Sequence, residues 1–245
     1  MFSVKFLIEL LLLIGVLMIP LIPVILAWLK GSEKLKVVRE KYHKAIEVTF
    51  KRIFNATTSH RVVSPLESIY EATNGVKAAG KVWLRDRRAY TYYLLKIFNP
   101  LKDMISFSIT TQYVPGCSMI IVSRSHRSLV EQAIAYAEQL EYVEIGGLED
   151  YLILTDNLTG IRHVLDRFIV QELVNMKKWI LYIIIDYSEP NVEFYIEVTD
   201  KDYAESIPRA VMLVKNIMER TRRVSPRREM IDTIKKLKRA LRLRE

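Results

Sequence analysis

The chain is poor in cysteine, glycine and histidine, and each shortage excludes a class of protein. One cysteine among 245 residues, Cys117, permits neither an internal disulfide framework nor a cysteine-rich zinc fold. The eight glycines form no phosphate-binding loop, dinucleotide-binding fingerprint or nucleophile elbow. His43, His60, His126 and His163 are scattered, and none has another metal-ligating residue at ligand spacing. We therefore expect no metal, no cofactor and no catalytic residue.

Apolar residues make up 50% of the chain, which excludes a disordered polymer, and they are concentrated near the amino terminus. Between residues 6 and 29 only a glutamate, a glycine and two prolines interrupt the apolar run. A helix of that length extends roughly 36 Å, enough to cross a hydrocarbon core of about 30 Å. The sequence therefore predicts a transmembrane anchor over residues 1–29. The run from Phe6 to Leu11 also resembles the start of type IV pilins, although Val4 stands where that family has Gly or Ala.

Positive charge lies at the two ends of the chain. The net charge is +9, of which residues 1–44 carry +4, residues 45–219 carry −3 and residues 220–245 carry +8. More basic residues follow the apolar run than precede it, and this bias favours a cytoplasmic domain with the amino terminus outside. The expected location is therefore the cell membrane, with a single pass.

The last residues are typical of a basic amphipathic helix, expected over 223–245. Ile231, Ile234, Leu237 and Leu241 recur at helical spacing along one side of it. Three roles stay open for this tail: packing on the domain, binding to anionic lipid of the membrane bilayer, and binding to the phosphate backbone of a nucleic acid. The candidate lipid contacts are Arg227, Arg228, Lys235, Lys236, Lys238, Arg239 and Arg242.

Helix patterns follow the anchor. Residues 33–54 carry an apolar stripe at a spacing near 3.6, and Ser64-Pro-Leu-Glu67 has the form of a helix start with a capping box. We therefore expect membrane-proximal helices over residues 30–80, the second running from Ser64 to about Gly75.

Strand patterns begin near residue 81. Strands are expected at 82–84, 90–98, 104–112 and 119–123, and a helix is expected from Ser128 to about Leu140. Tyr113-Val-Pro-Gly116 predicts a hairpin between the last two of these strands, with Cys117 at its edge. The charged run from Arg85 to Arg88 indicates a turn.

The clearest pattern is strand, helix, strand, strand, helix, at 151–155, 157–177, 179–187, 192–198 and 203–221. In the strand at 192–198, Glu193, Tyr195 and Glu197 alternate with apolar residues, which predicts one wet face. The fold class we expect after the anchor is α+β, with a mainly antiparallel sheet over residues 81–222 divisible into 81–145 and 148–222.

Part of this last unit resembles a known kind of protein. The run from Leu148 to Asp156, followed by a helix bearing Leu165, two strands and a helix, resembles the end of membrane-anchored domain-of-unknown-function families. The resemblance spans residues 148–221 and implies a membrane-tethered cytoplasmic domain. It implies no activity.

The best candidate site is an anion site between Ser123 and Ser128. Arg124 and Arg127 lead into an expected helix amino terminus at Ser128, and such termini favour anions. Without a catalytic constellation, the sequence favours binding: an adaptor or accessory subunit at the inner membrane surface, with an unidentified protein partner and the tail on anionic lipid. The alternatives are a membrane-tethered enzyme acting on a phosphorylated or other anionic small molecule, and nucleic-acid binding through the tail.

Overall fold

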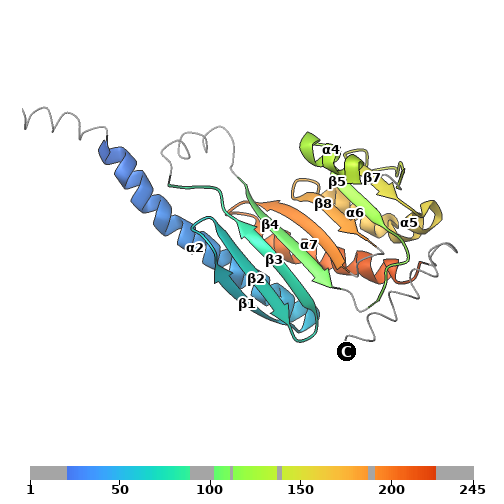
Figure 1. The fold of residues 1–245 in the computed structure, drawn as a ribbon, viewed down its shortest axis with the longest axis horizontal. Helices are drawn as coiled ribbons and strands as arrows, with labels where there is room; N and C mark the ends of the chain where they lie inside the picture. The colour runs from blue at the N-terminus through green and yellow to red at the C-terminus, as the bar shows by residue number, and fades with distance from the viewer. Residues whose placement is uncertain (1–20, 89–101, 111–112, 137–139, 187–190, 225–245) are drawn as a thin grey trace, which may run out of the picture.

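The computed structural model describes residues 21–88, 102–110, 113–136, 140–186 and 191–224 as one antiparallel sheet with helices on both faces (Figure 1). The strand order is β1-β2-β3-β4-β9-β8-β5-β7-β6, and every pairing is antiparallel. The strands are β1 Thr57–Val62, β2 Glu67–Thr73, β3 Lys77–Trp83, β4 Asp103–Thr110, β5 Met119–Ser123, β6 Glu141–Tyr142, β7 Tyr151–Thr155, β8 Ile180–Ile185 and β9 Asn191–Val198. The helices are α2 Leu21–Phe54, α4 Arg127–Tyr136, α5 Leu158–Val164, α6 Arg167–Asn175 and α7 Tyr203–Thr221.

The main core lies between one face of the sheet and the helices α2, α5, α6 and α7. In α2, Tyr42, Ile46 and Phe50 recur at helical spacing and are completely buried, because this stripe faces the sheet. On the sheet side, Phe107 of β4 stacks on Phe194 of β9 with ring centroids 4.5 Å apart. Alternate residues of these strands point into this core, so the intervening residues face the other way.

A second, smaller core lies on the opposite face. There α4 covers β5, β7 and β8, and Ile120, Val122, Leu152 and Leu154 are buried beneath it. The helix α4 lies at the end of the sheet that holds β5 and β7, away from β1, β2 and β3 (Figure 1). Helices therefore cover most of one face of the sheet but only one end of the other.

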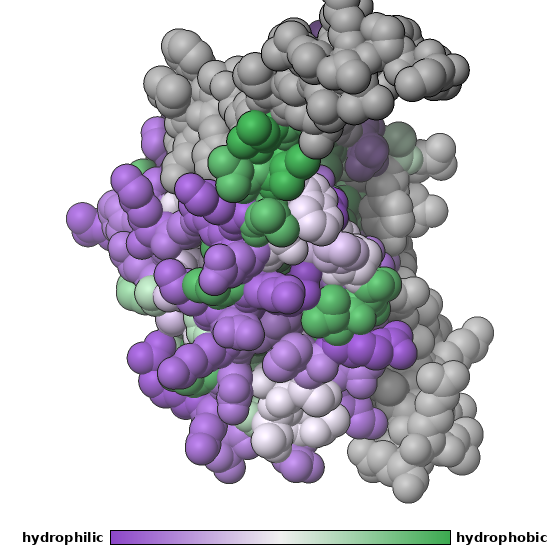
Figure 2. All heavy atoms as spheres, turned by 90° about the vertical axis from the view of Figure 1, so that its left-hand side faces the viewer, coloured by the Kyte–Doolittle hydropathy of each residue, from purple (hydrophilic) through white to green (hydrophobic). Residues whose placement is uncertain are grey.

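The expected transmembrane anchor is contradicted. Throughout the described ranges no helix is both long enough and apolar enough to cross a membrane. Of the predicted span, residues 1–20 lie outside the described residues, and residues 21–29 are the start of α2, which continues through the charged residues after Lys30 and packs on the sheet. Exposed apolar side chains gather at this start of α2 (Figure 2) and comprise Leu21, Ile22, Val24, Ile25, Leu26, Trp28 and Leu29.

The helix predicted from Ser64 is wrong, because this segment is the turn between β1 and β2. The Ser64 Oγ accepts hydrogen bonds from the amides of Leu66 and Glu67, at 3.2 and 3.1 Å. These are the bonds of a helix cap, but the residues that follow pair with β1 and β3 and form β2. Of the helices expected over residues 30–80, only the part up to Phe54 is helical.

The hairpin predicted between the strands at 104–112 and 119–123 is also wrong. The strand β4 lies between β3 and β9, whereas β5 lies between β8 and β7. The turn sequence at 113–116 therefore leads from one part of the sheet to another, and Cys117 is buried rather than at an edge. The strand expected at 90–98 lies outside the described residues.

Much of the remaining prediction is confirmed, including the α+β fold with an antiparallel sheet. The helix expected at 203–221 is α7, and the strand expected at 151–155 is β7. The helix expected at 157–177 is divided into α5 and α6, because the side chain of Asp166 caps a new helix by accepting a hydrogen bond from the Ile169 amide at 2.9 Å.

Candidate functional site

The two arginines of the predicted anion site are engaged with different protein groups. The Arg124 Nε donates to the Tyr151 carbonyl at 3.0 Å, and its Nη2 donates to the Tyr142 hydroxyl at 2.8 Å. Arg127 pairs with Glu131 one turn along α4, at 2.9 Å, with its side chain 92% exposed. Ser128 lies within the first turn of α4 rather than before it. The two arginines therefore serve separate contacts and do not converge on one point.

The candidate lipid contacts of the tail, between residues 227 and 242, lie outside the described residues. The lipid and nucleic-acid roles of the tail stay predictions.

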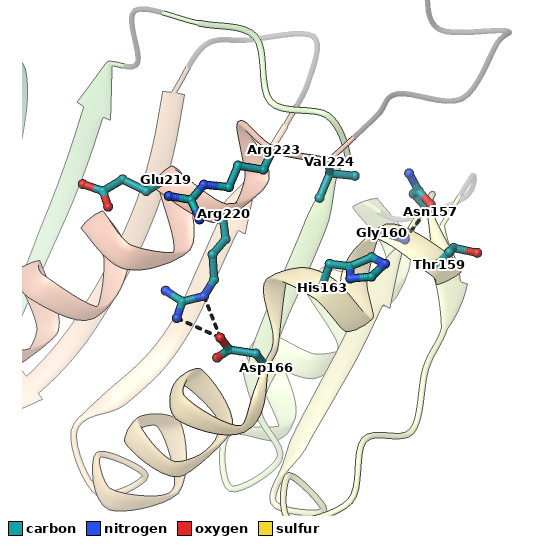
Figure 3. A pocket seen from close by; sticks show the side chains of 9 residues that line it. All are labelled: Asn157, Thr159, Gly160, His163, Asp166, Glu219, Arg220, Arg223 and Val224. Atoms are coloured by element: carbon teal, nitrogen blue, oxygen red, sulfur yellow. Dashed lines mark hydrogen bonds and ion pairs between the residues drawn. The ribbon is translucent and has the colours of Figure 1, made fainter.

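One cleft lies where α5, α6 and the end of α7 meet (Figure 3) and has a volume of about 700 Å³. Its main ion pair joins α7 to the cap of α6: Arg220 donates to Asp166 from Nε at 3.1 Å and from Nη2 at 2.8 Å. The lining residues are Asn157, Thr159, Gly160, His163, Asp166, Glu219, Arg220, Arg223 and Val224.

The charges of this cleft are largely committed to one another. Desolvation by burial raises the pKa of Asp166, but hydrogen bonds from the Ile169 amide and Arg220 outweigh this effect and lower the pKa overall. This carboxyl therefore remains an ionised helix cap and not a proton donor. Glu219 lies 3.9 Å from Lys215. His163 and Arg223 come from opposite sides of the cleft and do not point toward one another (Figure 3). We find no convergent nucleophile and base among these lining residues.

A second surface is the part of the sheet face that lies opposite α2 and α7. Over β2, β3, β4 and β9, no helix of the described residues covers this side (Figure 1), and we call it the open face. Its outward side chains are those that alternate with the core residues of the same strands. A pocket of about 260 Å³ lies in its centre, lined in part by Lys81, Trp83, Ser108, Glu193 and Tyr195.

Aromatic rings form a row that runs from the open face to the adjoining strand β8. The ring of Trp83 on β3 lies 5.9 Å from that of Tyr195 on β9, with an interplanar angle of 17°. Tyr195 in turn stacks on Tyr182 of β8 at 4.3 Å. Between Trp83 and Tyr195 the strand β4 contributes Ser106, which is opposite Tyr195 in the register and accepts a hydrogen bond from the Lys81 amide at 3.1 Å. The small residue Ser106 thus lies beside the large rings of Trp83 and Tyr195.

The charged groups around the row are mostly paired within the sheet. Lys81 lies 3.4 Å from Glu67, and Lys102 lies 2.8 Å from Glu197. Burial raises the pKa of Tyr182 far above its usual value, and a hydrogen bond with Tyr195 and the charge of Glu193 raise it further. Glu193 therefore lies within electrostatic reach of the ring row.

Sequence reasoning found one member of this surface. The alternation in residues 192–198 placed Tyr195 on the wet face of a strand, as the structure does. Trp83 lies 112 positions earlier in the chain, and no local pattern indicates that β3 and β9 lie on either side of β4. Knowing the strand order was necessary to recognise the row.

Comparison with known proteins adds no family. No protein-family model and no curated protein matches the chain. Among solved structures, the chain is similar to the mycobacterial trehalose monomycolate transport factor A, TtfA, at 8% identity and a TM-score of 0.37, covering 64% of this chain and 76% of that one. A match at this level carries no functional argument.

Proposed function

We propose that this protein acts by binding a protein partner on the open face of its sheet. The observation that carries the proposal is the pair of rings Trp83 and Tyr195 on a face that no helix of the described residues covers, continued by Tyr182 on β8, where the part covered by α4 begins. Tyrosine and tryptophan are the residues most enriched at the energetic centres of protein interfaces. Such rings on a rigid sheet provide contact area that loses little conformational entropy on binding.

The size of the central pocket favours a macromolecule over a small ligand. Its volume of about 260 Å³ is below the roughly 300–1,000 Å³ of typical small-molecule sites. A depression of this size suits an anchoring side chain from a larger partner surface.

The charge balance favours a protein over a nucleic acid or an anionic lipid surface. The described residues on and beside the open face carry no excess of basic groups: the acidic residues are Glu67, Glu71, Glu193 and Glu197, and the basic ones are Lys77, Lys81 and Lys102. Binding to phosphate-rich surfaces depends on an excess of cations, which this face does not supply. Ser108, which is opposite Ala79 on one side and Glu193 on the other, adds a hydroxyl group that an extended polypeptide can use.

Site-specific photocrosslinking in living cells tests the proposal. A benzophenone amino acid at Ser108 places the crosslinker on the open face, and the same residue at Ile134 places it on the exposed side of α4, where Ile134 is 58% exposed. We expect one discrete adduct from Ser108 and none of that size from Ile134. Equal adducts from both positions, or none from Ser108, would exclude the open face as the binding surface.

A further inference from the structure

We infer that the central pocket of the open face receives an arginine side chain of the partner. The inference rests on the proposed function and specifies the chemistry of the partner at one point. It follows from the two charged residues that line the pocket, from the Trp83 and Tyr195 rings, and from the small residues that line it beside them.

Only Lys81 and Glu193 carry charge among the residues that line the pocket. Lys81 is neutralised by Glu67 at 3.4 Å. Glu193 is exposed and makes no ion pair with any described residue. The pocket therefore has an unmatched negative charge at one end, and the complementary group is a cation.

The ring of Trp83 already has a cation beside it. The Lys81 ammonium lies 5.8 Å from the centroid of the Trp83 ring, within the range of a cation–π contact. The Trp83 and Tyr195 rings lie against one another, with centroids 5.9 Å apart, so a flat cation in the pocket contacts the ring surface beside this pair, next to the Glu193 carboxylate that also lines the pocket. Guanidinium combines these two contacts, because it is planar, stacks on aromatic rings and presents a fork of donors to a carboxylate. An ammonium group can make the charge contact but lacks the plane.

The floor of the pocket leaves room for such a group. Ala79 and Ser108 are opposite one another in the register of β3 and β4, and Glu193 is opposite Ser108 on β9. On the other side of Ala79, the neighbouring strand β2 places Glu71 opposite it in the same row. Two carboxylates thus end a row of small residues, but only Glu193 lines the pocket.

The test is a titration of the full chain with two probes of nearly the same shape, only one of which carries a charge. N-acetyl-arginine amide carries the guanidinium, and N-acetyl-citrulline amide is its uncharged counterpart of the same shape. Binding is followed by the indole N–H resonance of Trp83, which is identified by its loss in Trp83→Phe. We expect the arginine probe to move this resonance and the citrulline probe to bind at least about tenfold more weakly.

Two matched variants locate the charge. Glu193→Gln should weaken binding of the arginine probe about tenfold. Glu71→Gln removes the same charge from the same row and should leave the affinity for the arginine probe unchanged. Equal binding of both probes, no shift from either, or equal effects of the two variants would overturn the inference. A discrete crosslinked adduct from Ser108 together with any of these results leaves the proposed function intact, so the two failures are distinguishable.

Discussion

Arg87 and Asp103 form a bidentate ion pair in the interior of the protein. Arg87 Nη1 lies 2.9 Å from Asp103 Oδ1, Arg87 Nη2 lies 2.5 Å from Oδ2, and the two side chains are 1% and 0% exposed. Asp103 also accepts hydrogen bonds from the Tyr42 hydroxyl at 2.6 Å and the Arg85 amide at 2.8 Å. Because Tyr42 belongs to α2, the pair joins the long helix to the strands β3 and β4 at one end of the open face.

Replacing Arg87 should strongly destabilise the fold. Arg87→Met leaves the Asp103 carboxylate buried without its main counterion, which costs about 3–5 kcal/mol of unfolding free energy. The matched control is Arg88→Met, since Arg88 pairs with Asp86 on the surface with side chains 25% and 39% exposed, and that loss should be below about 1 kcal/mol. Urea unfolding measures both values. Similar losses in the two variants would contradict the structural role of the Arg87–Asp103 pair.

Stability should fall with acid through His43. Burial, followed by the nearby charges of His60 and Arg39, lowers the pKa of His43 to about 4, and its Nε2 lies 2.8 Å from the Ser68 hydroxyl. The folded chain therefore holds neutral His43 while the unfolded chain, with a pKa near 6.5, binds a proton. The contribution is present above pH ~6.5 and is lost as the pH falls toward 4, by up to about 3 kcal/mol.

His43→Gln should reduce the dependence of unfolding free energy on pH between about 6.5 and 4. His163→Gln is the control, because His163 is an exposed histidine on α5 and is not among the groups that shift the pKa of His43. Urea titrations at several pH values give the slopes. An unchanged slope in His43→Gln would show that another group carries the acid sensitivity.

A methyl group at Gly31 should separate α2 from the segment after β3. A Cβ there would lie 2.1 Å from the Arg87 carbonyl oxygen and 2.7 Å from the Arg88 Cα, and backbone cannot give way as a side chain can. Gly31→Ala therefore costs about 1–3 kcal/mol, even though alanine favours a helix by about 1 kcal/mol. Gly146→Ala is the control, since nothing lies within 4 Å of its Cβ. A thermal melt in which Gly31→Ala is the more stable variant would contradict this packing.

The lone thiol should be unreactive in the folded protein. Cys117 is fully buried, and burial together with the charge of Asp156 raises its pKa to about 12. Thiolate is the reactive form, so a maleimide should label the native chain only as fast as the chain opens. Stoichiometric labelling is expected in denaturant. Complete labelling of the native protein within the mixing time would show that Cys117 is accessible.

The elements that sequence predicted well are those whose pattern is local. The stripe of α7 and the apolar runs of β5 and β7 lie within one element, and their ends are marked by turns and caps. The misplaced helix at Ser64 shows the opposite case: the same capping bonds formed, but pairing with β1 and β3 decided the structure of the residues after it. Tertiary pairing outweighed a local preference worth about 1 kcal/mol.

The candidate site was largely out of reach of sequence because it depends on strand order. Arg87 belongs to a run that indicated only a charged turn, and its partner Asp103 is 16 positions away. Trp83 and Tyr195 meet across β4, and neither strand carries a signal for its neighbours. The predicted anion site at Arg124 and Arg127, in contrast, followed local charge, and the structure directs these side chains to Tyr142, Tyr151 and Glu131.

The measurement that tests the binding role of the open face most directly is the yield of the Ser108 crosslinked adduct when the ring row is removed. Trp83→Ser together with Tyr195→Ser deletes the two half-buried rings of the pocket, and because neither side chain is fully buried, the fold should survive. Far-ultraviolet circular dichroism confirms folding. We expect the adduct to fall at least tenfold in this variant, a loss of about 1.4 kcal/mol in binding. An undiminished adduct from a folded double variant would contradict a role for the open face in binding.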